Sequence, residues 1–138
     1  MRDERQGEAS IQEYEFPWPD EGKGYELFPK ELESDPLVFF HGTAKRNLDS
    51  IIKQGFKPFP PLESVSYAKS SVYCLTHICG RRKASEEVRE DDVVIAVRFE
   101  SLKTEGIQVN TSDIHVYKSE LQPRIIGYCT IPRDYRHV

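Results

Sequence analysis

The hydrophobic positions of this chain fall into short runs separated by proline-rich or charged segments. Residues 37–40 are apolar and rich in aromatic and β-branched side chains, so they predict a strand that ends at His41. From 44 to 54 the apolar residues recur at spacings of three and four, which predicts an amphipathic helix. Residues 56–67 contain three prolines and predict a long loop, a type of segment that often carries function.

The second half of the chain predicts a similar mixture of elements. Residues 71–76 alternate weakly between apolar and polar positions and predict a strand, and a polar helix follows from about 77 to 90. The run 93–99 predicts a strand that is buried on both faces. Shorter strands are predicted at 107–109, 114–117 and 125–131. Two helices and about six strands in mixed order predict an α+β fold.

The charges are divided unevenly between two parts of the chain. Among the 138 residues, 19 are Lys or Arg and 23 are Asp or Glu, which gives a net charge of −4. Residues 1–36 carry a net charge of −7 and four prolines, whereas the remainder carries +3. We therefore expect an acidic, proline-rich N-terminal arm over 1–36 and one folded domain over 37–138. The aromatic residues of the arm should pack against this domain, whose positive charge is compatible with an anionic ligand.

The spacing of the cysteines and histidines and the length of the apolar runs limit the class of protein further. The three cysteines form no Cys-x-x-Cys pair and the histidines lack metal-ligand spacing, so we expect neither a disulfide framework nor a metal site. The longest apolar runs are far shorter than the roughly 20 residues that cross a bilayer, and the first residues lack the apolar stretch of a signal peptide. These features favour a cytoplasmic protein with no membrane partner.

The segment 38–56 carries the most informative motif. A predicted buried strand leads to His41, Gly42 and Thr43, and a predicted helix then leads to a Gly-Phe pair at 55–56. Glycine permits a close approach of the backbone to a ligand, and histidine and threonine can hold the hydroxyl groups of that ligand. The segment is therefore suited to binding a polar ligand.

This segment resembles the first motif of the ADP-ribosyltransferase superfamily, which includes diphtheria toxin, the poly(ADP-ribose) polymerases and the RNA 2′-phosphotransferases. The resemblance implies an ADP-ribosyltransferase-like α+β fold with split, mixed or antiparallel β-sheets and two short helices. It also implies that His41 contacts the adenosine ribose of NAD and that the Gly42 backbone hydrogen-bonds the nicotinamide amide, with Thr43 beside them.

Two tyrosines are candidates for a contact with the nicotinamide ring. The stretch 71–76 looks like the strand of the superfamily whose tyrosine stacks on nicotinamide, which points to Tyr73. An aromatic face beside a cationic pyridinium contributes about 0.5 to 2 kcal/mol. Tyr67 is the second candidate, because it could enter the site from the preceding loop. The alternative for both tyrosines is a place in the hydrophobic core.

The catalytic position is where this sequence departs from the superfamily. Transferases of the superfamily usually place a glutamate at the start of a late strand, where its carboxylate stabilises the oxocarbenium-like state as nicotinamide leaves. Here the residues before the closing strand make Glu120, Gln122 and Arg124 the catalytic candidates. A cleft-facing Glu120 or Gln122 fits a transferase. Arg124 in that position fits phosphate recognition, as in the RNA 2′-phosphotransferases.

The resemblance implies a glycosyltransferase reaction in which ADP-ribose passes from NAD, used as a substrate, to a macromolecular acceptor that is a protein, DNA or RNA. Two alternatives stay open at this point. One is a non-catalytic module that binds NAD, ADP-ribose or a related nucleotide, and the other is an RNA 2′-phosphotransferase-like enzyme.

A basic cluster at 81–83 is expected on a solvated face.

Overall fold

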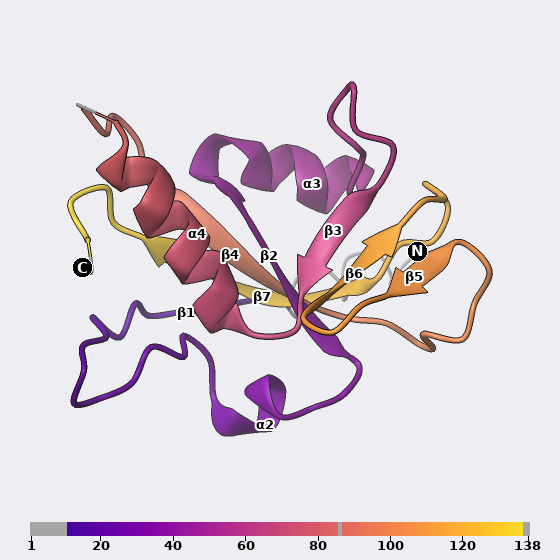
Figure 1. Cartoon of the computed structure of the whole chain (residues 1–138), viewed down its shortest axis with the longest axis horizontal. Coiled ribbons are helices and arrows are strands. Elements are labelled where there is room, and N and C mark those ends of the chain that lie inside the picture. The colour runs from indigo at the N-terminus through magenta and orange to yellow at the C-terminus, as the bar shows by residue number, and fades with distance from the viewer. Residues whose placement is uncertain (1–10, 86, 137–138) are drawn as a thin grey trace.

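The structure is a computed structural model that describes residues 11–85 and 87–136 (Figure 1). Within these ranges it has seven strands: β1 (Gln12–Tyr14), β2 (Val38–Ala44), β3 (Val65–Ala68), β4 (Asp92–Arg98), β5 (Ile107–Val109), β6 (Asp113–Val116) and β7 (Arg124–Ile131). The helices are α2 (Lys30–Glu33), α3 (Leu48–Gln54) and α4 (Ser71–Lys83), with the 3-10 helix η1 (Lys45–Asn47) leading into α3. No helix among these residues is long and apolar enough to span a bilayer. The predicted α+β class is confirmed.

The described strands form one mixed sheet in the order β1-β7-β4-β2-β3-β6-β5. β1 runs parallel to β7, and the other neighbours are antiparallel. β4 lies between β2 and β7, because its apolar residues can be buried on both faces. β2 continues to Ala44, beyond the predicted end at His41, because its whole length pairs with β4.

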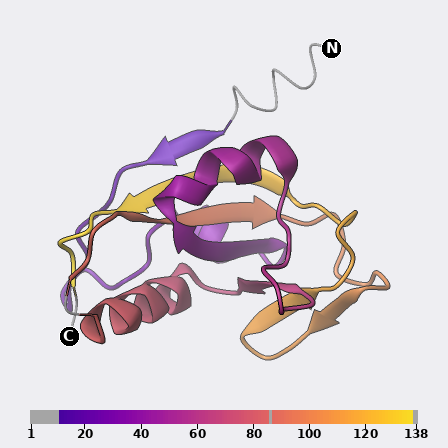
Figure 2. The same cartoon turned by 90° about the horizontal axis from the view of Figure 1, so that it is seen from above.

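The sheet is almost divided between β2 and β3. Only Phe40 and Ala68 are paired at this boundary. The strands therefore form two groups, β1-β7-β4-β2 and β3-β6-β5, and Figures 1 and 2 show the second group set to one side of the first. Because the ladder stops after Phe40, the later residues of β2 have a backbone edge that is not paired with β3.

Two cores lie on opposite faces of the larger group of strands. Residues of α4 and of the N-terminal arm belong to the core on one face, and α3 lies over the other face (Figure 2). The first core includes Phe40 and Leu75, and the second includes Phe39 and Leu48. Because side chains alternate along a strand, His41 lies on the same face of β2 as Phe39, towards α3.

The N-terminal arm contributes to the sheet and to the first core. Its strand β1 lies beside β7, where Gly127 is needed because a Cβ there would lie 2.4 Å from a backbone oxygen of β1. The expected packing of the arm aromatics is confirmed for Phe16 and Phe28, which are buried, and Phe28 stacks on Phe40 at 5.2 Å between ring centroids. Trp18 stays half-exposed at 52%.

The predicted strand over 71–76 is wrong, because these residues form the start of α4. The Ser70 side chain caps the helix by accepting a hydrogen bond from the Val72 N–H at 3.1 Å. The buried positions of α4 recur at helical spacing, namely Cys74, Leu75, Ile78 and Cys79. α4 begins earlier than predicted and ends at Lys83 instead of near 90. The segment 56–67, which was predicted as a loop, contains most of β3.

A buried arginine of α4 holds the C-terminal segment. The Arg82 guanidinium is 1% exposed, and its Nε and Nη2 donate to Oδ2 of Asp92 at 3.2 and 2.9 Å. Its Nη1 and Nη2 also donate to carbonyl oxygens at and after the end of β7, those of Ile131, Pro132 and Tyr135. The expectation of a solvated face for 81–83 is therefore wrong for Arg82, which follows Ile78 and Cys79 on the buried side of the helix.

Candidate functional site

His41 lies where β2 separates from β3, against two aromatic rings that also contact each other. Its ring centroid is 5.2 Å from that of Phe56 and 5.6 Å from that of Tyr67. Its Nδ1 is 2.9 Å from the carbonyl oxygen of Ser66. A carbonyl oxygen can only accept, so Nδ1 carries the proton and Nε2 is an acceptor. Burial lowers the pKa of His41 although the Ser66 bond raises it, so the neutral form is favoured.

At Gly42 a side chain would face the other side of β2, where α4 comes close. A Cβ at this position would lie 3.4 Å from Cδ1 of Ile78 and 3.5 Å from Cβ of Cys74. The Gly42 N–H hydrogen-bonds the Cys74 thiol, whose pKa burial raises to about 12. The absence of a side chain therefore lets the first turns of α4 pack against the free edge of β2.

Thr43 and Tyr67 complete the surroundings of His41. The Thr43 hydroxyl accepts a hydrogen bond from Nδ2 of Asn47 at 2.9 Å, which ties it to the turn before α3. Tyr67 lies on β3 instead of in a loop, is 1% exposed, and has its pKa raised by burial. Neither the Tyr67 hydroxyl nor Nε2 of His41 makes a hydrogen bond to the described residues. Nε2 of the partly buried His41 is thus left for a ligand, whereas the Tyr67 hydroxyl is enclosed in the core.

Tyr73 lies in the first turn of α4 and not on a strand. It is 53% exposed, and no ring contact involves it among the described residues. The next residue, Cys74, is the one that meets Gly42. Tyr73 is therefore exposed on the helix that borders the Gly42 edge of β2, whereas Tyr67 lies in the core against His41.

The three catalytic candidates line a different part of the surface. Glu120, Gln122 and Arg124 border one open groove of about 550 Å³, together with Arg98. Gln122 uses its amide to hold the chain after α3: its Oε1 accepts from the Phe56 N–H at 2.8 Å, and its Nε2 donates to the Phe56 carbonyl at 2.9 Å. Gln122 is thus linked to His41 only indirectly: its amide bonds the Phe56 backbone, and the Phe56 ring packs against the His41 ring. Glu120 is exposed in the connection before β7.

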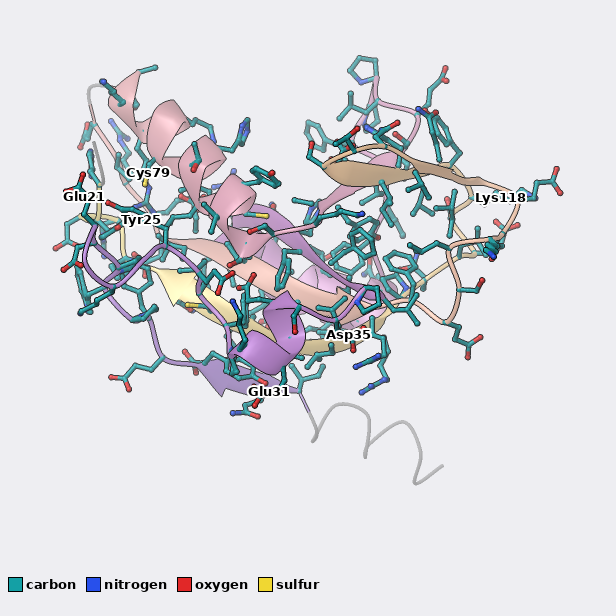
Figure 3. All side chains as sticks on the ribbon, turned by 60° about the horizontal axis from the view of Figure 1, so that its bottom comes forward. Glu21, Tyr25, Glu31, Asp35, Cys79 and Lys118 are labelled. Carbon is teal, nitrogen blue, oxygen red and sulfur yellow. The ribbon has the colours of Figure 1, made fainter. Side chains whose placement is uncertain are left out.

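Arg124 lies away from His41 in both register and face. Arg124 on β7 is paired with Arg98 on β4. Arg98 is in turn paired with Val38 on β2, three residues before His41. Val38 belongs to the core under α4, so Arg124 is on the face opposite to His41. Arg98 is bound by Asp35 at 2.6 Å, just beyond α2 (Figure 3). The structure therefore brings none of the three catalytic candidates into contact with His41.

A carboxylate that the sequence did not single out lies at the start of α4. Glu33 of the arm accepts hydrogen bonds from the Ser71 hydroxyl, from the Ser71 N–H at 3.4 Å and from the Phe28 N–H at 3.2 Å. Burial raises its pKa in spite of these bonds. No local pattern distinguishes Glu33 from the other acidic residues of the arm, so only the folded structure reveals this position.

Comparison of the sequence with models of known protein families and with curated proteins finds no match. Among residues 11–85 and 87–136, no group of three or more His, Cys, Asp or Glu side chains is arranged to hold a metal ion.

Proposed function

We propose that this protein binds a nucleotide of the NAD or ADP-ribose type at the free edge of β2. The observation that carries the proposal is the hydrogen bond between His41 Nδ1 and the Ser66 carbonyl. It fixes the tautomer in which Nε2 accepts, and a ribose hydroxyl is a donor that matches this nitrogen. The resemblance of the His-Gly-Thr segment to the ADP-ribosyltransferase superfamily supports the same ligand class and an ADP-ribosyltransferase-like fold.

Other groups near His41 fit the remaining parts of such a ligand. The exposed ring of Tyr73 can stack on a nicotinamide ring that approaches the backbone of Gly42. The net charge of +3 outside residues 1–36 favours the pyrophosphate.

Binding without transfer agrees best with the arrangement of charged groups. Transfer requires a carboxylate where positive charge develops on the ribose. Glu120, Gln122 and Arg124 border the groove away from His41. We therefore rank binding above ADP-ribose transfer to a protein, DNA or RNA. RNA 2′-phosphate processing is the third hypothesis, and it requires Arg124.

Calorimetric titration of the purified protein with NAD and with ADP-ribose tests the proposal. We expect saturable binding that His41→Ala weakens more than tenfold, or about 1.4 kcal/mol. His77→Ala is the matched control, because His77 is an exposed histidine of α4. Its affinity should equal that of the parent protein.

Two results would contradict the binding proposal. One is the absence of binding by protein whose folding is confirmed, and the other is an unchanged affinity in His41→Ala. Labelled NAD incubated with the protein and a cell extract separates binding from transfer. Nicotinamide release with label on a macromolecule would establish the transferase instead.

A further inference from the structure

A second set of reactive side chains lies on the smaller group of strands. Ser64 comes directly before β3, and His115 and Asp113 belong to β6. Ser64 Oγ is 3.0 Å from His115 Nδ1, and His115 Nε2 is 3.4 Å from Asp113 Oδ2. Asn110 Nδ2 donates to the other carboxylate oxygen of Asp113 at 2.9 Å. The contacts form a continuous chain from a hydroxyl through an imidazole to a carboxylate.

The register of β3 and β6 places these groups on an accessible face. Ser66 is opposite His115 and Ala68 is opposite Asp113. Because alternate residues share a face, Ser64 lies on this face too, opposite to the face where Ile114 is buried. The side chains of His115 and Asp113 are 32% and 36% exposed, so a substrate can reach them.

The two contacts of His115 fit one tautomer of its ring, which is suited to base catalysis. A carboxylate can only accept, so the Asp113 oxygen 3.4 Å from Nε2 favours the tautomer with the imidazole proton on that nitrogen. Nδ1 then accepts from the Ser64 hydroxyl. A serine bound to a base that a third group orients is the arrangement of an activated nucleophile. We propose that Ser64 is a nucleophile towards esters, with His115 as its base and Asp113 as a positioning residue.

The proposed reaction is ester hydrolysis in two steps. Ser64 Oγ bonds to the carbonyl carbon while its proton passes to His115 Nδ1. The C–O bond of the ester then breaks, and the same proton goes to the departing alkoxide to give the alcohol. Water next attacks the acyl carbon and gives a proton to Nδ1. The carboxylic acid leaves as that proton returns to Ser64 Oγ.

Exposed apolar side chains beside Ser64 indicate the class of substrate. Leu62, two residues before Ser64, is 65% exposed, and Phe59 in the same loop is 80% exposed. Directly after β6, the Tyr117 ring lies 6.4 Å from the His115 ring and is also exposed. These side chains favour an ester with an apolar acyl group, since burying them against it removes apolar surface from water.

Labelling with a fluorophosphonate tests the nucleophile directly, without NAD. The Ser64 oxygen would bond to phosphorus, fluoride would leave, and His115 would take the proton. We expect mass spectrometry of the digested protein to find the adduct on Ser64. Labelling should vanish in Ser64→Ala and slow at least tenfold in His115→Gln. Ser112→Ala, which removes an exposed hydroxyl next to Asp113, should label at the rate of the parent protein.

Hydrolysis of p-nitrophenyl butyrate gives the second readout. Asp113→Asn should lower the rate at least tenfold, and Asp113→Glu should restore part of it, because only a carboxylate requires the proton on Nε2. An adduct on another residue, or equal labelling rates in the parent protein and in His115→Gln, would overturn the proposal. The result is independent of nucleotide binding, which the titrations test separately.

Discussion

Replacement of Arg82 by methionine should strongly destabilise the fold. Methionine retains an unbranched stem but removes the guanidinium. Asp92 then stays buried, at 3% exposure, with Arg81 Nη2 at 3.2 Å as its remaining ion-pair partner. The carbonyl oxygens at and after the end of β7 also lose the donor that fixes the C-terminal segment. Both changes leave buried polar groups without compensation.

The magnitude of the loss follows from the burial of the pair. Removal of one partner from a buried ion pair costs about 3–5 kcal/mol. That is a large part of the roughly 5–15 kcal/mol that stabilises a typical protein. At about 2.1 cal/mol/K per residue, the unfolding entropy of 138 residues is about 0.29 kcal/mol/K. A loss of about 4 kcal/mol therefore lowers Tm by about 14 °C.

Thermal and urea unfolding, followed by circular dichroism, measure this loss. Arg81→Met is the matched control, because Arg81 contacts the same Asp92 but is 53% exposed, and its replacement should cost about 0–1 kcal/mol. Arg82→Met combined with Asp92→Asn should recover part of the loss, since the unpaired charge is removed. Equal destabilisation by the two methionine variants, or a loss below about 1 kcal/mol in Arg82→Met, would refute the reasoning.

Three further predictions concern the arm and the site. Burial raises the pKa of Glu33, so the parent protein loses stability as pH rises from the ordinary glutamate pKa of 4.5 through the raised pKa of the folded state. Glu33→Gln lacks this loss and should gain stability relative to the parent protein over that range; parallel pH curves would contradict this. Gly127→Val should displace β1, because a Cβ lies 2.4 Å from the Gln12 carbonyl oxygen; limited proteolysis should then cut the arm. Burial lowers the pKa of His41, so acid weakens the fold below about 6.5, and His41→Phe should lessen this loss in urea titrations.

The central strands could be predicted because their local pattern determines them. β4 and β7 lie within one residue of the predicted runs 93–99 and 125–131. The start of α4 could not be predicted from alternation, because apolar residues in the stretch 71–76 fit a strand as well as a helix. Ser70 as an N-cap, with buried residues continuing to Arg82, distinguishes the two. The helix can be recognised only when the pattern is followed from Ser70 to Arg82 instead of over 71–76 alone.

The candidate site could be predicted only where its residues are neighbours in the chain. His41 and Gly42 are adjacent, and the period of a strand sends them to opposite faces. The bond from Gln122 to Phe56 spans 66 residues, and the contact between Ser64 and His115 spans 51. Such contacts depend on the register of strands and on the connections between them. No local pattern in the sequence encodes them.

The bond from His41 to Ser66 also has a structural role, because it links the two groups of strands one residue beyond their only ladder pair. The two roles are compatible, since Nδ1 holds the backbone and Nε2 accepts from the ligand. A weaker affinity in His41→Ala could therefore reflect loss of either contact. An NAD analogue that lacks the adenosine 2′-hydroxyl separates them. If Nε2 accepts from that hydroxyl, its removal should weaken binding about tenfold in the parent protein and little in His41→Ala, whereas a purely structural histidine gives equal losses in both.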